Sequence, residues 1–411
     1  MKMGASFLMF VLLLLAFTGH SSASLRTLDY TFNEDCNELC KNTKVKLAHV
    51  MATGSNDTIH YLWDFTENPS ILIAVTSPSA KLKVNWKKYL ARSPYALNFT
   101  EIPTYTLGIA MERLFEFNDV NDNARIDLVN DNWVSELNLN NFDWHHENMT
   151  KYDNLVEFKT EASGYKDNDR NETRKGQIKF LMHAFNSLNH SEINPHMLHS
   201  ENATQMDIVF DHLETKKDFT ASRFALELLI VSSTSPFNAT LNKDDTRKLD
   251  DEFTPGVFEV IELKLPASYI NSGYLQWSPV SYIYPERDVI NSTSSISYPL
   301  KNATTNDYFN MHNLLYMYYG DKLWDNLARR MNISFGEKND GFYKATNYAT
   351  WTFVTGFGTI PAERFSSVTI LIIALGIGIP VMSLLFAGIY ALVRRRSRFN
   401  HELPIEPSIL R

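Results

Sequence analysis

Residues 224–230 read Phe-Ala-Leu-Glu-Leu-Leu-Ile, with a large apolar side chain at every second position from Phe224 to Ile230. Successive side chains of an extended chain point to opposite faces, so this alternation predicts a β-strand with one face in a core. The same period recurs in four other segments, which are 82–86, 107–117, 178–182 and 206–210. Three further strand candidates are 71–75, 257–265 and 274–284.

Helical periodicity is scarce in the same part of the chain. Only 322–331 is predicted as a helix, because its apolar residues share one helical face and Asp321 precedes it as an N-cap. The polar stretches 118–154 and 160–176 are predicted to be long loops or edge regions. Many short strands separated by turn-rich gaps are typical of an antiparallel sandwich. We therefore predict a mainly β body, built as an antiparallel β-sandwich-like domain.

The first 23 residues have the charged, apolar and small-residue order of a secretory signal peptide. Lys2 precedes an apolar run from Phe7 to Phe17, and small residues around Ala23 and Ser24 supply a cleavage site. The alternative is an N-terminal anchor, but a run of 11 apolar residues is too short to cross about 30 Å of hydrocarbon. We expect residues 1–23 to be removed during export.

Residues 366–393 contain no charged side chain and are predicted to form a transmembrane helix. Their strongly apolar part, 368–393, would be about 39 Å long as an α-helix, which is enough to span a bilayer with some tilt. Arginines follow directly, and the positive-inside rule places the tail 394–411 in the cytoplasm. The chain is therefore predicted to be a single-pass type I membrane protein. Its lumenal part, 24–365, would be one β domain or two β subdomains.

The formal net charge of −8 hides a basic tail and an acidic lumenal part. Residues 394–411 contain five arginines and two glutamates, so the acidic excess lies in the lumenal part. A nucleic-acid-binding surface needs a basic patch, and we therefore expect no nucleic-acid partner. The tail arginines have two interpretations, contact with anionic lipid of the inner leaflet or a simple stop-transfer signal.

Ten Asn-x-Ser/Thr sequons lie between the two membrane-directed segments, and eight of them end in Thr. In a secreted chain each predicts an N-glycan on an exposed loop. The candidate acceptors are Asn56, Asn98, Asn148, Asn171, Asn189, Asn202, Asn238, Asn291, Asn302 and Asn332. Dense glycans with few cysteines suggest a protein that survives among hydrolases in a lysosome-like lumen. A cell-surface ectodomain is the competing interpretation.

The catalytic and metal-binding motifs in this sequence are incomplete. His145-His146-Glu147 begins like a zinc motif, but Thr150 stands where the second ligand belongs. His196 and His199, near His183 and His190, could bind a metal or respond to acid, or be incidental. Asp119-x-Asn121-x-Asn123 imitates half of a calcium loop, but Ala124 and Asn130 replace the required Gly and Glu. No cofactor is predicted.

Two cysteines and two small-residue motifs complete the candidate sites. Cys36 and Cys40 are close enough for a local disulfide in an oxidising lumen. Within the span, Ala374 with Gly378, and Ala387 with Ala391, match small-xxx-small faces that pack against another helix. Pro380 is predicted to kink the helix.

Several strings, taken in order with the signal peptide and the single span, resemble the glycosylated lysosomal membrane protein family. They are His60-Tyr61-Leu62-Trp63, Val84-Asn85-Trp86, residues 113–117 (RLFEF), residues 250–258 (DDEFTPGVF), residues 276–282 (QWSPVSY), residues 332–336 (NISFG), and Trp351 with Gly358 and Pro361. No single string is a signature, but seven in family order cover most of the lumenal part.

The resemblance implies an accessory subunit and not an enzyme. Members of the family look like partners of a polytopic major facilitator superfamily transporter in the lysosomal membrane, which they stabilise and shield from proteolysis while it exports small peptides. Two alternatives are a lumenal hydrolase that uses Asp251 and Glu252, and a receptor or adhesion ectodomain at the plasma membrane.

Two departures from the family pattern concern cysteines and sorting. No cysteine follows Cys40, whereas vertebrate members carry lumenal cysteines in the second half. The tail contains no Tyr for sorting; Glu406, Ile409 and Leu410 only approximate an acidic dileucine signal. Lysosomal delivery is therefore expected to depend on that near-dileucine or on the partner.

Overall fold

A computed structural model describes residues 26–41, 43–167, 172–233, 243–248, 259–265, 272–304, 313–341, 343–362 and 367–401. Residues Ala23–Pro361 form one compact unit, and the helix α4 (Ser367–His401) belongs to another. The larger unit consists mostly of β-strands, and every pairing among its described strands is antiparallel. The predicted mainly β fold is confirmed.

One sheet has eleven strands, and its main path runs β1-β2-β3-β4-β7-β15-β22-β20-β19. The short strands β8 and β21 pair with β7 and β22 beside this path. Their bounds are β1 Thr27–Phe32, β2 Leu47–Thr53, β3 Thr58–Asp64, β4 Ser70–Thr76, β7 Tyr105–Asn118, β8 Val134–Leu137, β15 Ser222–Ser232, β19 Val280–Tyr282, β20 Ser292–Ser297, β21 Lys301–Asn302 and β22 Leu327–Phe335.

The second sheet has eight strands in the order β16-β17-β18-β23-β14-β11-β10-β9. They are β9 Asp143–Lys151, β10 Leu155–Asp167, β11 Glu172–Phe185, β14 Ala203–Asp211, β16 Lys243–Lys248, β17 Glu259–Leu265, β18 Gly273–Trp277 and β23 Tyr348–Phe357. Two small two-stranded sheets pair β5 (Leu82–Val84) with β6 (Leu97–Phe99) and β12 (Asn189–His190) with β13 (Leu198–His199).

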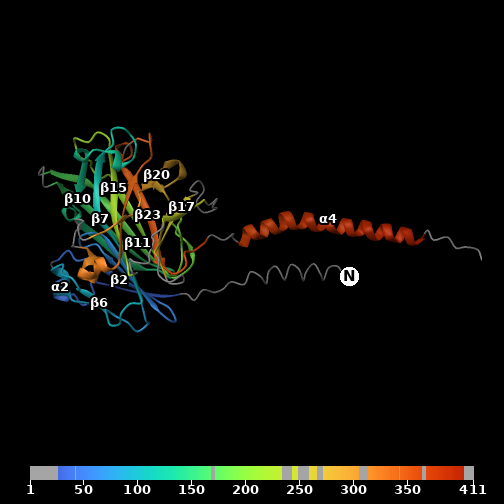
Figure 1. Ribbon diagram of the computed structural model, residues 1–411, viewed down its shortest axis with the longest axis horizontal. Helices are drawn as coiled ribbons and strands as arrows, with labels where there is room; N and C mark the ends of the chain where they lie inside the picture. Colours follow the sequence, from blue (N-terminus) through green and yellow to red (C-terminus); the bar gives the residue numbers. More distant parts are fainter. Residues whose placement is uncertain are drawn as a thin grey trace, which may run out of the picture. The chain divides into compact units, whose positions relative to one another are not determined.

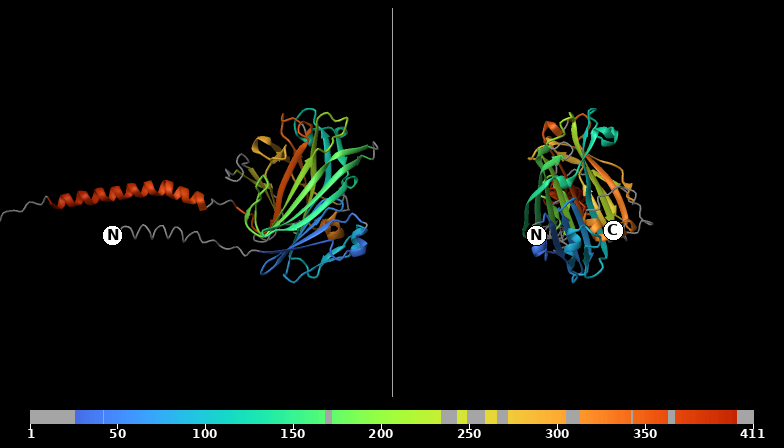
Figure 2. Two further views of the ribbon diagram at one scale, coloured as in Figure 1. Left: turned by 180° about the vertical axis from the view of Figure 1, so that it is seen from behind. Right: turned by 90° about the vertical axis from the view of Figure 1, so that its left-hand side faces the viewer.

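The main core lies between the inner faces of the two large sheets (Figures 1 and 2). Phe65, which follows β3, contacts Phe158 of β10 and Phe180 of β11, with ring centroids 5.5 and 5.2 Å apart. Phe224 of β15 stacks on Phe210 of β14 at 5.2 Å. Aromatic contacts across the gap show that the alternating faces seen in the sequence meet each other, as in a sandwich.

A second core covers the opposite face of the eleven-stranded sheet. The helices α2 (Trp86–Leu90) and α3 (Leu314–Tyr319) pack there with the β5–β6 hairpin, and α3 lies against β4 and β7. All eleven residues of β15 are consequently buried. Phe224 and Ile230 face the inter-sheet core, whereas Leu229 and Val231 face the helices. Strand β15 is therefore covered on both faces.

The predicted strands over 71–75, 107–117, 178–182, 206–210 and 224–230 are confirmed. The candidate 257–265 is confirmed over its described residues, which form β17, and 274–284 divides into β18 and β19. The prediction over 82–86 is confirmed only in part, because β5 ends at Val84 and α2 begins at Trp86. The predicted helix over 322–331 is wrong, because a 3-10 helix ends at Asp325 and β22 begins at Leu327. The long loop or edge region predicted over 160–176 is also wrong, because β10 and β11 pair with each other there and neither is an edge strand. The stretch 118–154 contains short 3-10 helices, β8 and the edge strand β9.

The helix α4 has a candidate membrane span at Leu375–Ser397. Pro380 lies inside the helix. The helix continues past the predicted end of the span at Val393, through the arginines, to His401. The predicted signal peptide, residues 1–23, lies outside the described residues.

Candidate functional site: the sequon-bearing surface

Five of the predicted glycan acceptors have exposed side chains. Asn56 lies in the turn between β2 and β3, and the other four lie in strands: Asn98 in β6, Asn148 in β9, Asn189 in β12 and Asn302 in β21. An exposed asparagine amide has room for a bulky glycan, so all five positions are geometrically suited to modification.

Three acceptors are half-buried and make contacts within the fold. The Nε of Arg26 donates to Oδ1 of Asn202 over 2.6 Å, and Arg26 also pairs with Asp57. Asn291 ends a 3-10 helix, and the carbonyl of Asn332 in β22 accepts a hydrogen bond from the Tyr298 amide. These three positions have less room for a glycan than the exposed five.

Several predicted site residues lie outside the described residues. They are the acceptors Asn171 and Asn238, the acidic pair Asp251 and Glu252, and the sorting candidates Glu406, Ile409 and Leu410.

Cys36 and Cys40 form a disulfide, with their Cα atoms 5.5 Å apart. The two residues flank a one-turn 3-10 helix, and Cys36 packs in the second core beside Trp86. The indole nitrogen of Trp86 donates to the carbonyl of Glu34 over 2.8 Å. This bond ties the segment just before the disulfide to α2.

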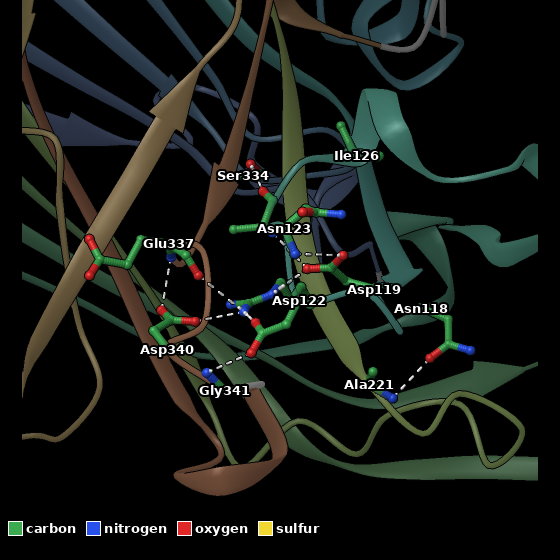
Figure 3. Close-up of polar contacts among 12 residues, drawn as sticks. Asn118, Asp119, Asp122, Asn123, Ile126, Ala221, Ser334, Glu337, Asp340 and Gly341 are labelled. Carbon is green, nitrogen blue, oxygen red and sulfur yellow. Dashed lines mark hydrogen bonds and ion pairs between the residues drawn. The ribbon is translucent and has the colours of Figure 1, made fainter.

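The segment that resembles a calcium loop instead binds the guanidinium of Arg223. Asp119, Asp122 and Asp340 point toward one another in Figure 3. Nε of Arg223 donates to Asp119 over 2.9 Å, and Nη2 donates to Asp340 over 2.6 Å and also to Asp122. The carboxylate of Asp119 additionally accepts the backbone amides of Asn123 and Ala124. Its oxygens are therefore occupied by protein donors.

The electrostatics of this cluster favour a permanently charged arginine. Only 3% of the Arg223 side chain and 1% of the Asp119 side chain are exposed. Burial by itself would lower the pKa of Arg223, but the hydrogen bonds and charges of Asp340, Asp122 and Asp119 outweigh burial and raise it. A charge-assisted network of this kind joins the start of β15 to the loop after β7 and the turn after β22.

Two more buried arginines were not signalled by any sequence motif. Arg174 of β11 pairs with Glu116 at 2.6 Å and Asp167 at 2.8 Å. Arg287 grips both carboxylate oxygens of Asp207 at 2.9 and 2.6 Å. Glu116 and Asp207 are 58 and 80 positions from their arginines, so only the fold reveals these two pairs.

The histidine candidates do not assemble into a metal site among the described residues. His199 stacks on Phe185 with ring centroids 3.4 Å apart, and its Nδ1 contacts the Ser187 carbonyl over 3.0 Å. Burial lowers the pKa of His199 to about 3. His183 hydrogen-bonds Glu157 over 3.2 Å, and His145 lies in β9. The side chains of His183, His196 and His199 therefore contact groups of the protein itself.

His49 and His60 form a buried pair that no sequence motif predicted. Nε2 of His49 lies 2.9 Å from Nδ1 of His60, whose Nε2 lies 3.0 Å from the hydroxyl of Thr76. Burial lowers the pKa of His49 to about 3, with a further contribution from His60, and lowers the pKa of His60 to about 4. Both rings are therefore neutral near pH 7.

The predicted packing residues Ala374, Gly378, Ala387 and Ala391 all lie in α4. A Cβ added at Gly376, Gly378 or Gly388 would meet no atom within 4 Å in the described part of the chain. Ala387 and Ala391 are exposed. Packing of these small residues against another membrane helix stays a prediction.

Comparison with known proteins assigns the chain to a family. A family model described as glycosylated lysosomal membrane protein matches residues 46–398. The chain belongs to the glycosylated lysosomal membrane protein family. Glycosylated lysosomal membrane protein A of Xenopus laevis is 28% identical to this chain over 373 residues, covering 89% of this chain and 90% of that protein. The relatives of the same name from Danio rerio and Homo sapiens are 27% and 23% identical, covering 86% and 87% of this chain and 85% and 86% of their own lengths.

Membership in the glycosylated lysosomal membrane protein family fits the architecture. The chain is a lysosomal membrane protein with a large β ectodomain followed by one C-terminal candidate span. Neither the family description nor the names of these relatives states a catalytic activity.

Proposed function

We propose that this protein is a non-catalytic accessory subunit of a polytopic major facilitator superfamily transporter that exports small peptides from the lysosome. It would stabilise that transporter and protect it from lysosomal proteolysis. The class of partner follows from the family resemblance in the sequence. The observation that carries the proposal is the small-residue face of α4, where a side chain at Gly378 would meet no atom within 4 Å in the described chain.

The ectodomain supports a protective role through its predicted glycans. Ten sequons occur between the predicted signal peptide and the span, and five of the described acceptors are exposed. Glycans at these positions would keep proteases away from the backbone. In the described residues, the buried carboxylates of Glu116, Asp119 and Asp207 pair with arginines and hold structure.

Affinity recovery from crosslinked lysosomal membranes tests the proposal. We expect a transporter with many membrane spans to be recovered with the full chain. In cells that lack this chain, the half-life of the transporter should shorten. Failure to recover any multi-spanning protein would contradict the proposal.

A matched pair of variants tests the helix face. Gly376 and Gly378 are two residues apart, which places them about 200° apart around an α-helix. Gly378→Leu should reduce recovery of the transporter because it blocks close helix approach, whereas Gly376→Leu adds the same side chain to the other side. Equal recovery with both variants would exclude the Ala374–Gly378 face as the contact.

A further inference from the structure

Among the strands that carry an exposed glycan acceptor, the nine-residue β9 is the longest, and it lies at the edge of its sheet. β9 ends the eight-stranded sheet, and among the described strands it pairs with β10 alone. A strand at the end of a sheet presents unpaired backbone groups that can pair with another chain. Asn148 lies near its middle and is exposed.

The sequon faces outward from the sandwich. Met149 packs against the inter-sheet core, so its neighbours Asn148 and Thr150 point to the other face of the strand. A glycan on Asn148 would therefore project from the outer face, directly beside the open edge, without disturbing the core.

Protein side chains cover the first part of this edge, where Lys46, with 3% of its side chain exposed, pairs with Glu147 of β9. From Asn148 to the end of β9 the contacts are weaker. β1, the last strand of the eleven-stranded sheet, contacts β9 through side chains: Tyr30 donates to the Met149 carbonyl over 3.5 Å, and Lys151 pairs with Asp29 at 2.9 Å. Lys151 and Asp29 are 44% and 67% exposed, and exposed ion pairs contribute little and are screened by salt.

Exposed aromatic side chains surround this edge. Tyr30 and Phe32 of β1 are each 37% exposed, and Tyr152, which directly follows β9, is 49% exposed. Aromatic side chains next to unpaired backbone groups favour association between sheet edges.

We propose that the N-glycan on Asn148 caps the β9 edge and prevents it from pairing with β9 of a second copy of this chain. This inference rests on the glycosylation included in the proposed function. Without the glycan, two β9 strands pair antiparallel about a twofold axis, because the same edge then serves as both donor and acceptor surface.

Four variants of the full chain, expressed in glycosylating cells and solubilised in detergent, test the proposal. Asn148→Gln and Thr150→Ala each destroy the sequon, whereas Thr150→Ser keeps it. Asn56→Gln removes an exposed sequon from a turn and controls for the loss of any glycan. Glycan number is read from mobility before and after endoglycosidase, and mass from light scattering after size exclusion.

We expect Asn148→Gln and Thr150→Ala to lose one glycan and to shift several-fold toward dimers, while Thr150→Ser and Asn56→Gln match the parent chain.

Three results would overturn the cap. If Asn148→Gln loses one glycan but does not shift from monomer to dimer, Asn148 carries a glycan and the cap is refuted. An unchanged glycan number in Asn148→Gln would show that the site carries no glycan. Equal self-association of Asn56→Gln would show that the effect is not specific to the edge.

Discussion

At the scale of single residues, buried charges and buried imidazoles fix how the loops and strands of the sandwich are joined. Arg223 holds three aspartates from the loop after β7 and the turn after β22, and its own strand is completely buried. A guanidinium forms several directed bonds at once, which is why a lysine cannot replace it fully.

Replacing Arg223 with Met should destabilise the fold by about 3–5 kcal/mol, because removing one partner leaves buried carboxylates uncompensated. Arg223→Lys should be less harmful. Urea unfolding of the full chain in detergent measures the difference. The matched control is Arg125→Met, since Arg125 and Asp127 form a pair in which both side chains are nearly half exposed and which contributes less than about 1 kcal/mol. A loss for Arg223→Met no larger than for the control would contradict the prediction.

His49 and His60 should make the fold less stable in acid. Their folded pKa values, about 3 and about 4, lie below the ordinary value of 6.5, so the unfolded chain binds protons first as the pH falls. Their contribution is complete above about pH 6.5 and declines as the pH falls toward 4, by about 2 kcal/mol per histidine at pH 5.

Unfolding at pH 7.5 and pH 5 measures this loss. His49→Gln/His60→Gln should show a smaller loss on acidification than the parent chain. An identical slope in the double variant would rule out the pair as the source.

At the scale of elements, the second core depends on a close approach between β7 and α3. A Cβ built on Gly108 would lie 2.2 Å from Cδ2 of Leu315. Because Gly108 has no side chain, α3 can pack closely on a face of the sheet that would otherwise be exposed to solvent.

Gly108→Ala and Leu315→Ala should each destabilise the fold, the first by about 1–3 kcal/mol through overpacking and the second by about 2–5 kcal/mol through a cavity. The double variant should lose less than the sum, because the new methyl group occupies space that Leu315 vacates. A double-mutant cycle in urea measures the coupling. Strict additivity would show that the two residues do not share the contact.

The sequence predicted strands where apolar alternation was strong, and it failed where the same spacing has two meanings. Leu327 and Met331 are four residues apart, which places them on one face of a helix but also on one face of a strand. The structure uses the strand β22, beside β15. Asn326, which caps the preceding 3-10 helix in an extended conformation, marks the change.

The β10–β11 hairpin was missed because its inward residues are not consistently apolar. Thr160 is buried, and a bulge at Ser163 and Tyr165 shifts the alternation around Gly164, whose φ is +60°. The site was predictable only in part, since sequons and cysteines are local patterns, whereas most of the arginine pairs join residues 58 to 117 positions apart.

At the scale of the whole molecule, a sequon-rich β ectodomain and a C-terminal helix belong to two different compact units of a lysosomal membrane protein. Resistance to proteolysis should depend on the ectodomain glycans. Endoglycosidase treatment of the folded full chain should shorten its half-life in a lysosomal protease extract several-fold, measured by immunoblot, while its urea midpoint stays nearly constant. Unchanged degradation would remove shielding as the purpose of the sequons.

The strand order has a consequence for how the molecule is made. In the pairing of β7 with β15, Asn118 lies opposite Ser222, so β7 cannot complete this pairing until β15 has been synthesised. At about 5–20 residues per second, the roughly 100 residues between them take about 5–20 s. During that delay the newborn chain has a half-built sheet in the secretory lumen, and non-local pairing of this kind is slow. Asn98, Asn148, Asn189 and Asn202 are all translated before β15. Sugars added there would already be in place to keep the nascent chain soluble, before the strand that closes the sheet exists.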